Sequence, residues 1–131
     1  MLRLPDLNLG ELEHAVLEDL WEHGPAKPGD VHRRVGRPRG ISPNTVSSAL
    51  KRLHEKGLLD REKISHAYVY SARTSRAGLQ RQLIEALAGQ FAHGEGGFLA
   101  AFVDLAEQQG EETLRRLERM IAERLDEGSG R

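Results

Sequence analysis

Apolar residues recur at helical spacing in the middle of the chain, and this stretch predicts a helix over residues 43–56. Its buried side is formed by Val46, Ala49, Leu50 and Leu53. Ser42 suits the N-cap, and Pro43 suits the first helical position because its missing N–H needs no partner there. Gly57 is placed to end the helix in a left-handed conformation.

The opposite side of this helix is polar, with hydroxyl and amide groups near its start and cations further along. Amide and hydroxyl groups can read base edges, whereas lysine and arginine can reach phosphates. We therefore interpret it as a recognition helix for the DNA major groove. The expected DNA contacts on it are Asn44, Thr45, Ser47, Ser48, Lys51 and Arg52.

Two short strands are expected after the helix, over residues 58–62 and 67–71, with residues 63–66 as the turn between them. Near its tip this hairpin carries three further expected DNA contacts, Arg61, Lys63 and His66. A helix followed by a basic hairpin is the arrangement of a winged helix. A solvated helix face beside a surface hairpin would give similar polar residues, so the distribution of charge matters.

Charge is strongly segregated along the 131 residues, although the formal net charge is only −1. Residues 1–26 carry a net charge of −5, residues 27–76 a net charge of +8, and residues 77–131 a net charge of −4. A cationic middle between two acidic ends is typical of a local site for a polyanion. This pattern favours DNA binding over a merely solvated surface.

The segment before the recognition helix predicts two more helices. Asn8 and Glu11 resemble a capping box for the first helix, which ends at Gly24-Pro25. Its lone tryptophan, Trp21, is expected to pack in the core. Pro28 begins a second helix that Gly36 closes, and Arg33 and Arg34 lie where they could contact phosphates. Three helices and a hairpin together predict a winged-helix DNA-binding domain over residues 1–73.

The remainder of the chain predicts helices over residues 74–127 and a disordered tail over residues 128–131. These helices have apolar faces with little else in the chain to cover them, which favours packing against a second copy. Folding back onto the same subunit is the alternative. The expected dimer interface comprises Leu83, Leu87, Phe91, Leu114, Leu117, Ile121 and Leu125. The expected fold class is thus mostly α with a small β-hairpin, a winged helix-turn-helix followed by C-terminal dimerisation helices.

Several kinds of chemistry find no support in the sequence. The chain has no cysteine, which excludes disulfides and thiolate metal sites. Its six histidines lack the spacing of a zinc motif, so we expect neither a metal nor a cofactor nor an enzyme, although histidines and carboxylates could still meet in space. The longest apolar run is six residues, 98–103, and no export signal is evident, so we expect no membrane insertion and a cytoplasmic protein.

Several short motifs, in order and spacing, resemble the BlaI/MecI/CopY family of penicillinase-type repressors. The similarity extends from about residue 9 to residue 125. The matching motifs are Leu9-Gly10-Glu11-Leu12-Glu13 with Val16, Leu20-Trp21, Ser42-Pro43-Asn44-Thr45-Val46, Arg52-Leu53, Lys56-Gly57-Leu58, Tyr68-Val69-Tyr70, Gly96-Gly97-Phe98 and Phe102-Val103-Asp104.

The resemblance implies a homodimeric repressor on a palindromic double-stranded DNA operator. It places Thr45 and Ser47 among the base-reading positions, although this chain has Ser47 where a cation is common and Asn44 where the family has lysine. The copper-binding cysteine motif of some members is absent. The β-lactam-responsive members imply cleavage at Ala101–Phe102 under a membrane metalloprotease signalling system, which the residues themselves leave open. A winged helix that binds only proteins, without DNA, is the competing interpretation.

Overall fold

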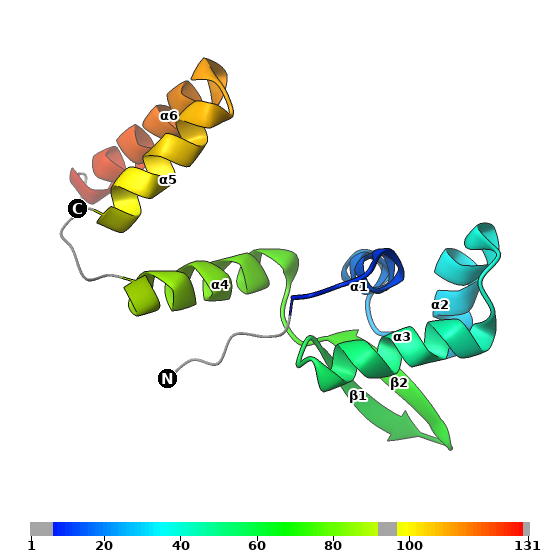
Figure 1. Cartoon of the computed structure of the whole chain (residues 1–131). Helices are drawn as coiled ribbons and strands as arrows, with labels where there is room; N and C mark the ends of the chain where they lie inside the picture. Colours follow the sequence, from blue (N-terminus) through cyan, green and yellow to red (C-terminus); the bar gives the residue numbers. More distant parts are fainter. Residues whose placement is uncertain (1–6, 92–96, 130–131) are drawn as a thin grey trace. The chain divides into compact units, whose positions relative to one another are not determined.

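The structure, a computed structural model, describes residues 7–91 and 97–129. Its elements, shown in Figure 1, are α1 (Glu11–His23), α2 (Pro28–Val31), η1 (His32–Gly36), η2 (Arg37–Arg39), α3 (Pro43–Glu55), β1 (Leu59–Ile64), β2 (Ala67–Ala72), α4 (Arg76–Phe91), α5 (Gly97–Gln108) and α6 (Glu111–Ser129). The chain divides into two compact units, Met1–Ala86 and Leu87–Arg131. The predicted fold class, mostly helical with one antiparallel hairpin, is confirmed.

The first unit is built around one apolar core between α1, α3 and the hairpin, which lie close together in Figure 1. The predicted stripe of α3 is the centre of this core, because all four of its apolar residues are fully buried. Around them are buried Val16, Leu17, Leu20, Val31, Val35, Leu58, Leu59 and Tyr70. One side of α3 is therefore buried in the core, and its other side is exposed to solvent.

The start of α3 forms as predicted. Ser42 is the N-cap residue, and its Oγ accepts a hydrogen bond of 3.2 Å from the backbone N–H of Thr45. Pro43 occupies the first turn. The helix ends at Glu55, one residue before the predicted end, and Gly57 follows with a φ of 84°. The sequence thus determines both ends of α3 locally.

The start of α1 and the end of the second helix differ from prediction. The N-cap residue of α1 is Gly10, without a side-chain hydrogen bond, so the capping box expected at Asn8 is wrong. The second helix is α-helical only to Val31 and continues as the π-helical segment η1 and the 3₁₀ turn η2. At the end of η1 the backbone of Gly36 lies close to the side chains of His32 and Val46, which leaves no room for a side chain at this position.

The hairpin turn is tighter than predicted. Ile64 pairs with Ala67, so only Ser65 and His66 connect the strands rather than four residues. Both have left-handed backbones, with φ of 48° and 69°. This is the backbone that a two-residue hairpin turn requires for the natural twist of the strands. Because neither residue is glycine or asparagine, no local pattern in the sequence predicts the shorter turn.

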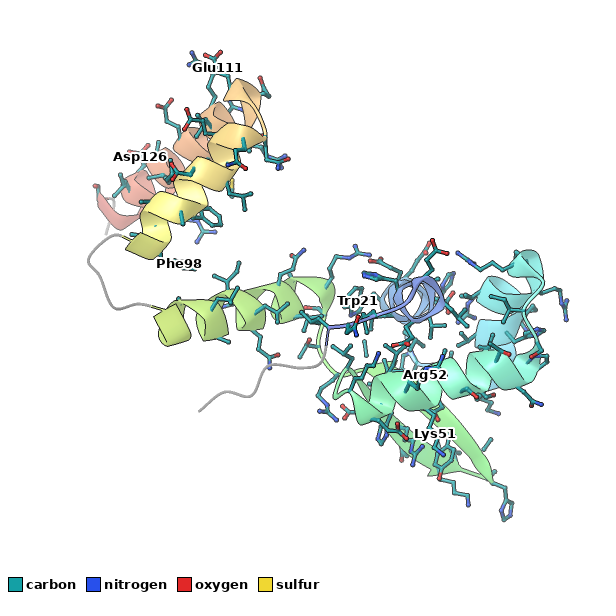
Figure 2. All side chains as sticks on the ribbon, in the orientation of Figure 1. Trp21, Lys51, Arg52, Phe98, Glu111 and Asp126 are labelled. Atoms are coloured by element: carbon teal, nitrogen blue, oxygen red, sulfur yellow. The ribbon has the colours of Figure 1, made fainter. Side chains whose placement is uncertain are left out.

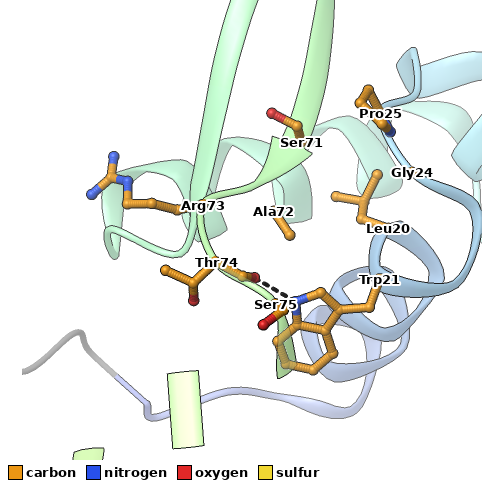
Figure 3. A pocket seen from close by; sticks show the side chains of 9 residues that line it. All are labelled: Leu20, Trp21, Gly24, Pro25, Ser71, Ala72, Arg73, Thr74 and Ser75. Atoms are coloured by element: carbon orange, nitrogen blue, oxygen red, sulfur yellow. Dashed lines mark hydrogen bonds between the residues drawn. The ribbon is translucent and has the colours of Figure 1, made fainter. Parts of the chain in front are cut away.

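Helix α4 belongs in part to the first unit, since Leu79 joins the core and Leu83 is partly buried against it. The division between units therefore falls after Ala86, whereas the sequence predicted a domain boundary at residue 73. Trp21 is half-buried, and its Nε1–H donates to the carbonyl oxygen of Thr74 at 2.8 Å. Figure 3 shows this bond at the edge of a shallow pocket.

The second unit contains α5 and α6, two neighbouring helices joined by a short turn at Gly110, whose φ is 117°. Helix α6 extends to Ser129, so residues 128–129, expected in the disordered tail, are helical. Residues 130–131 of that tail lie outside the described residues. Within the described part of the chain, no helix is both long and apolar enough to cross a lipid bilayer.

Candidate nucleic-acid interface

The polar side of α3 is open to solvent along its whole length. The side chains expected to contact DNA on this side are all exposed, namely Asn44, Thr45, Ser47, Ser48, Lys51 and Arg52. Thr45 also takes part in the cap, because its hydroxyl lies 2.9 Å from Ser42 Oγ. Helix α3 thus packs on the core with one side and exposes hydroxyl, amide and charged groups on the other. This exposed side can enter a groove of a polar partner.

Arg52 differs from Lys51, its neighbour on α3 in Figure 2, because it is paired within the protein. Its Nε lies 3.3 Å from the carboxylate of Glu13 on α1. Lys56 Nζ donates to the same carboxylate at 2.6 Å, and only 8% of Glu13 is exposed. The pairs fasten α3 to α1, so Arg52 has a structural partner in addition to its predicted DNA contact. Its DNA contact stays a prediction.

Alternation along the hairpin separates its charges onto two faces. In β1, Arg61 and Lys63 share a face with the buried Leu59, whereas Asp60 and Glu62 point to the other face. The first face is therefore cationic and continues the side of the hairpin that packs on the core. Tyr68 and Tyr70 of β2 lie opposite Lys63 and Arg61 on this same face.

The cationic face of the hairpin adjoins the last turn of α3. Arg61 lies over the ring of Tyr68, with 4.4 Å between the guanidinium carbon and the ring centre. A side-chain hydrogen bond to Tyr70 raises the pKa of Arg61 above its ordinary value, and the charge of Glu55 on α3 contributes to the same shift. Glu55 ends the outward row of α3. Because α3 packs against β1, the end of the polar row lies next to the cationic face of the hairpin.

Arg33 and Arg34, the two arginines of η1, are both paired with carboxylates of the protein. Arg34 makes a bidentate contact with Asp19 on α1, with its Nε at 3.0 Å from one oxygen and its Nη2 at 2.9 Å from the other. This hydrogen-bonded pair raises the pKa of Arg34. Arg33 pairs with Asp30 at 3.2 Å. Arg34 thus holds its helix to α1, and its expected contact with phosphates stays a prediction.

The residues expected at a dimer interface lie in different surroundings. Leu83 is partly buried against the core of the first unit, and Leu114 and Leu117 are half-buried. Leu87, Ile121 and Leu125 are exposed large apolar residues. The side chain of Phe91 lies outside the described residues. Ala101 and Phe102, which flank the expected cleavage bond, are both exposed within α5.

Two features of this surface escaped the sequence analysis. The carboxylate of Glu13 meets cations 39 and 43 positions away, which no local pattern reveals. Period-two alternation could have placed Tyr68 on the cationic face, but its contact with Arg61 depends on the register of the hairpin. Among the described residues, no cluster of three histidines or carboxylates could hold a metal ion.

A buried helix-turn-helix core, an exposed polar helix and an adjoining cationic hairpin define the winged-helix class of DNA-binding proteins. The comparisons with known proteins agree. The solution structure of the DNA-binding domain of the repressor BlaI superposes with a TM-score of 0.50 at 25% identity, covering 59% of this chain and 92% of that domain.

The sequence relatives extend the match beyond this domain. The penicillinase repressor family matches residues 9–123. The transcriptional regulator BlaI of Mycobacterium tuberculosis is 33% identical over 124 residues, covering 93% of this chain and 88% of that protein. The penicillinase repressor of Bacillus licheniformis is 30% identical over 71 residues, covering 54% of each chain. The chain belongs to the penicillinase repressor family, and its function is that of a DNA-binding transcriptional regulator.

Proposed function

We propose that this regulator is a homodimeric repressor that binds a palindromic operator in double-stranded DNA. Helix α3 of each protomer lies in the major groove of one half-site, and the hairpin lies on the sugar–phosphate backbone. The observation that carries this proposal is the continuity between the exposed polar row of α3 and the cationic face of the hairpin. Two such surfaces, related by a two-fold axis, match half-sites about one helical turn apart.

The proposed contacts divide into two chemical classes. Asn44, Ser47 and Ser48 carry short amide and hydroxyl groups at the start of α3, which suit base edges; Thr45 belongs with them. Longer cations reach the backbone instead, and these are Lys51, Arg52, Arg61 and Lys63, together with His66 at the tip of the hairpin. The first class sets sequence preference and the second sets general affinity.

Dimerisation is proposed from apolar surface that the described part of the second unit leaves exposed. On α6, Ile121 is 51% exposed and Leu125 is 66% exposed, and both continue the stripe that begins at Leu114. Helices with such a stripe gain stability chiefly by packing it against another surface. A second copy of the same segment supplies a matching stripe and brings two α3 helices together on one operator.

We also propose that the activity is binding rather than catalysis, and that it takes place in the cytoplasm, where a repressor meets its operator. The membrane metalloprotease system and the cleavage of the Ala101–Phe102 bond remain a proposal from family resemblance. The bond lies within helix α5, so cleavage there would require the helix to open locally.

Selection of bound sequences from a random duplex pool tests the proposed roles. Asn44→Ala or Ser48→Ala should change the selected sequence, because each removes a group that reads bases. Lys51→Ala should weaken binding to all sequences to a similar degree while the selected sequence stays the same. A changed preference for Lys51→Ala with an unchanged one for Asn44→Ala would reverse the assignment. No recovered DNA for the unmodified chain would favour a module that binds only proteins.

Sedimentation of the full chain tests the dimer. Ile121→Asp should give monomers that bind an operator weakly, because the new charge would be buried between two stripes. Ala122→Asp is the matched control, since it adds the same charge at an exposed neighbouring position off the stripe. Unchanged dimers for Ile121→Asp would exclude this interface.

A further inference from the structure

The hairpin holds an aromatic side chain whose role the proposed contacts leave unassigned. Tyr68 is 39% exposed, although a large ring at the end of a two-stranded ribbon has little core to fill. Its ring centre lies 6.1 Å from that of Tyr70 at an interplanar angle of 54°. Tyr70 is almost fully buried, so it anchors the exposed ring to the core of the domain.

The exposed ring carries a cation. The guanidinium carbon of Arg61 lies 4.4 Å above the centre of the Tyr68 ring, within the range of a cation–π contact. Planar guanidinium groups stack well on aromatic faces and keep their outer N–H groups free to donate. Arg61 is also only half-exposed. The contact therefore limits the freedom of a long side chain while leaving part of its charge at the surface.

The register of the strands is what makes this contact possible. Lys63 is directly opposite Tyr68, and Arg61 is opposite Tyr70, so Arg61 reaches Tyr68 along the diagonal between neighbouring pairs. All four side chains share the cationic face, because they alternate with Asp60, Glu62 and the remaining residues of the other face. The face of the hairpin that meets α3 is thus an aromatic platform with two cations on it.

We propose that Tyr68 is a positioning residue for DNA binding, whose ring holds the Arg61 guanidinium in the orientation in which it meets the DNA backbone. This inference rests on the proposed function and adds to it that Arg61 contacts the DNA while Tyr68 orients Arg61. A free arginine loses side-chain entropy when it is immobilised at an interface. An arginine already held on a ring loses less, so the contact with DNA is stronger than its charge alone would give.

The test is the salt dependence of binding to a mixed-sequence DNA duplex, measured on the full chain. Arg61→Ala should make the logarithmic plot of affinity against salt shallower by about one, the share of one phosphate contact. Tyr68→Leu should bind roughly three- to fivefold more weakly, the equivalent of a solvent-exposed cation–π contact. Its plot should keep the slope of the unmodified chain, because Arg61 still neutralises the same phosphate. Adding Tyr68→Leu to Arg61→Ala should change little further.

Tyr68→Phe is the matched control, because it keeps the ring and removes only the hydroxyl. It should restore both the affinity and the salt dependence of the unmodified chain. If Tyr68→Leu did not fold, as judged by the fluorescence of Trp21, Tyr68→Thr would take its place, since threonine suits a strand and has no ring.

Two results would overturn the inference while leaving the proposed function intact. Either Tyr68→Leu has the same effect on binding with and without Arg61, or Tyr68→Phe loses as much binding as Tyr68→Leu. Failure of the unmodified chain to bind any duplex would instead contradict the proposed function.

Discussion

Among the glycines that the structure describes, Gly36 is the one where an added methyl group would meet the nearest neighbours. A Cβ atom there would lie 2.6 Å from His32 Cδ2, 2.7 Å from Val46 Cγ2 and 3.2 Å from the carbonyl oxygen of Ile41. Val46 is fully buried and β-branched, and the ring of His32 is held by a contact of 2.9 Å between its Nε2 and the same carbonyl oxygen. None of the three neighbours can withdraw easily.

Two opposing effects set the size of the loss on Gly36→Ala. The backbone of Gly36 is right-handed helical, with φ of −79° and ψ of −48°, so alanine fits its conformation. Alanine should therefore contribute about 1 kcal/mol through helix propensity. Forcing a methyl group into a filled core costs about 3 kcal/mol at the upper end of the usual range. The net expectation is a destabilisation of about 2 kcal/mol, because the steric cost exceeds the conformational gain.

Urea unfolding of the full chain, followed by Trp21 fluorescence, measures this difference, since the lone tryptophan lies in the same unit as Gly36. Gly29→Ala is the control: it lies in helix α2, and its added Cβ meets nothing within 4 Å. It should leave stability unchanged or raise it slightly. A Gly36→Ala chain as stable as the unmodified chain would refute the packing argument.

Three further variants should lower stability, leave it almost unchanged and raise it, respectively. Asp19→Asn should lower the free energy of unfolding by about 2 kcal/mol, because it weakens the charged hydrogen bonds to Arg34 on a carboxylate that is only 7% exposed. By contrast, Glu111 forms an exposed pair with Arg115, so Glu111→Gln should change the free energy of unfolding by less than about 0.5 kcal/mol. If urea unfolding gave the same loss for both variants, burial would not explain the strength of the Asp19–Arg34 pair. Replacing Ser65 by asparagine and His66 by glycine should stabilise the hairpin by about 1 kcal/mol, since these residues accept left-handed backbones. A lower thermal midpoint for that double variant would show that the turn is unstrained.

Local signals in the sequence determined the part of the fold that carries the site. The cap at Ser42, the proline after it and the buried stripe all concern residues close together, so periodicity and helix-end chemistry predict α3 almost to the residue. The family resemblance drew on this stretch together with motifs elsewhere between Leu9 and Asp104, and it is confirmed. The exposed polar face then follows from the position of the buried one.

Features that depend on distant partners could not be predicted in this way. Arg34 is one example. Its side chain donates to the carboxylate of Asp19, fifteen positions earlier, and no local pattern in the sequence indicates this pair. The tight environment of Gly36 depends on Val46, ten residues later and on another helix. The contact between Arg61 and Tyr68 required the register of a turn whose residues adopt left-handed backbones without being glycine. In each case the determining interaction is tertiary rather than local.

The most direct measurement is the affinity of the full chain for mixed genomic DNA as salt is raised. Neutralising several phosphates with the cations of α3 and the hairpin should release counterions, so affinity should fall steeply and linearly on logarithmic axes. A binding constant that does not change with salt, or no binding at low salt, would contradict the claim that this face grips the DNA backbone.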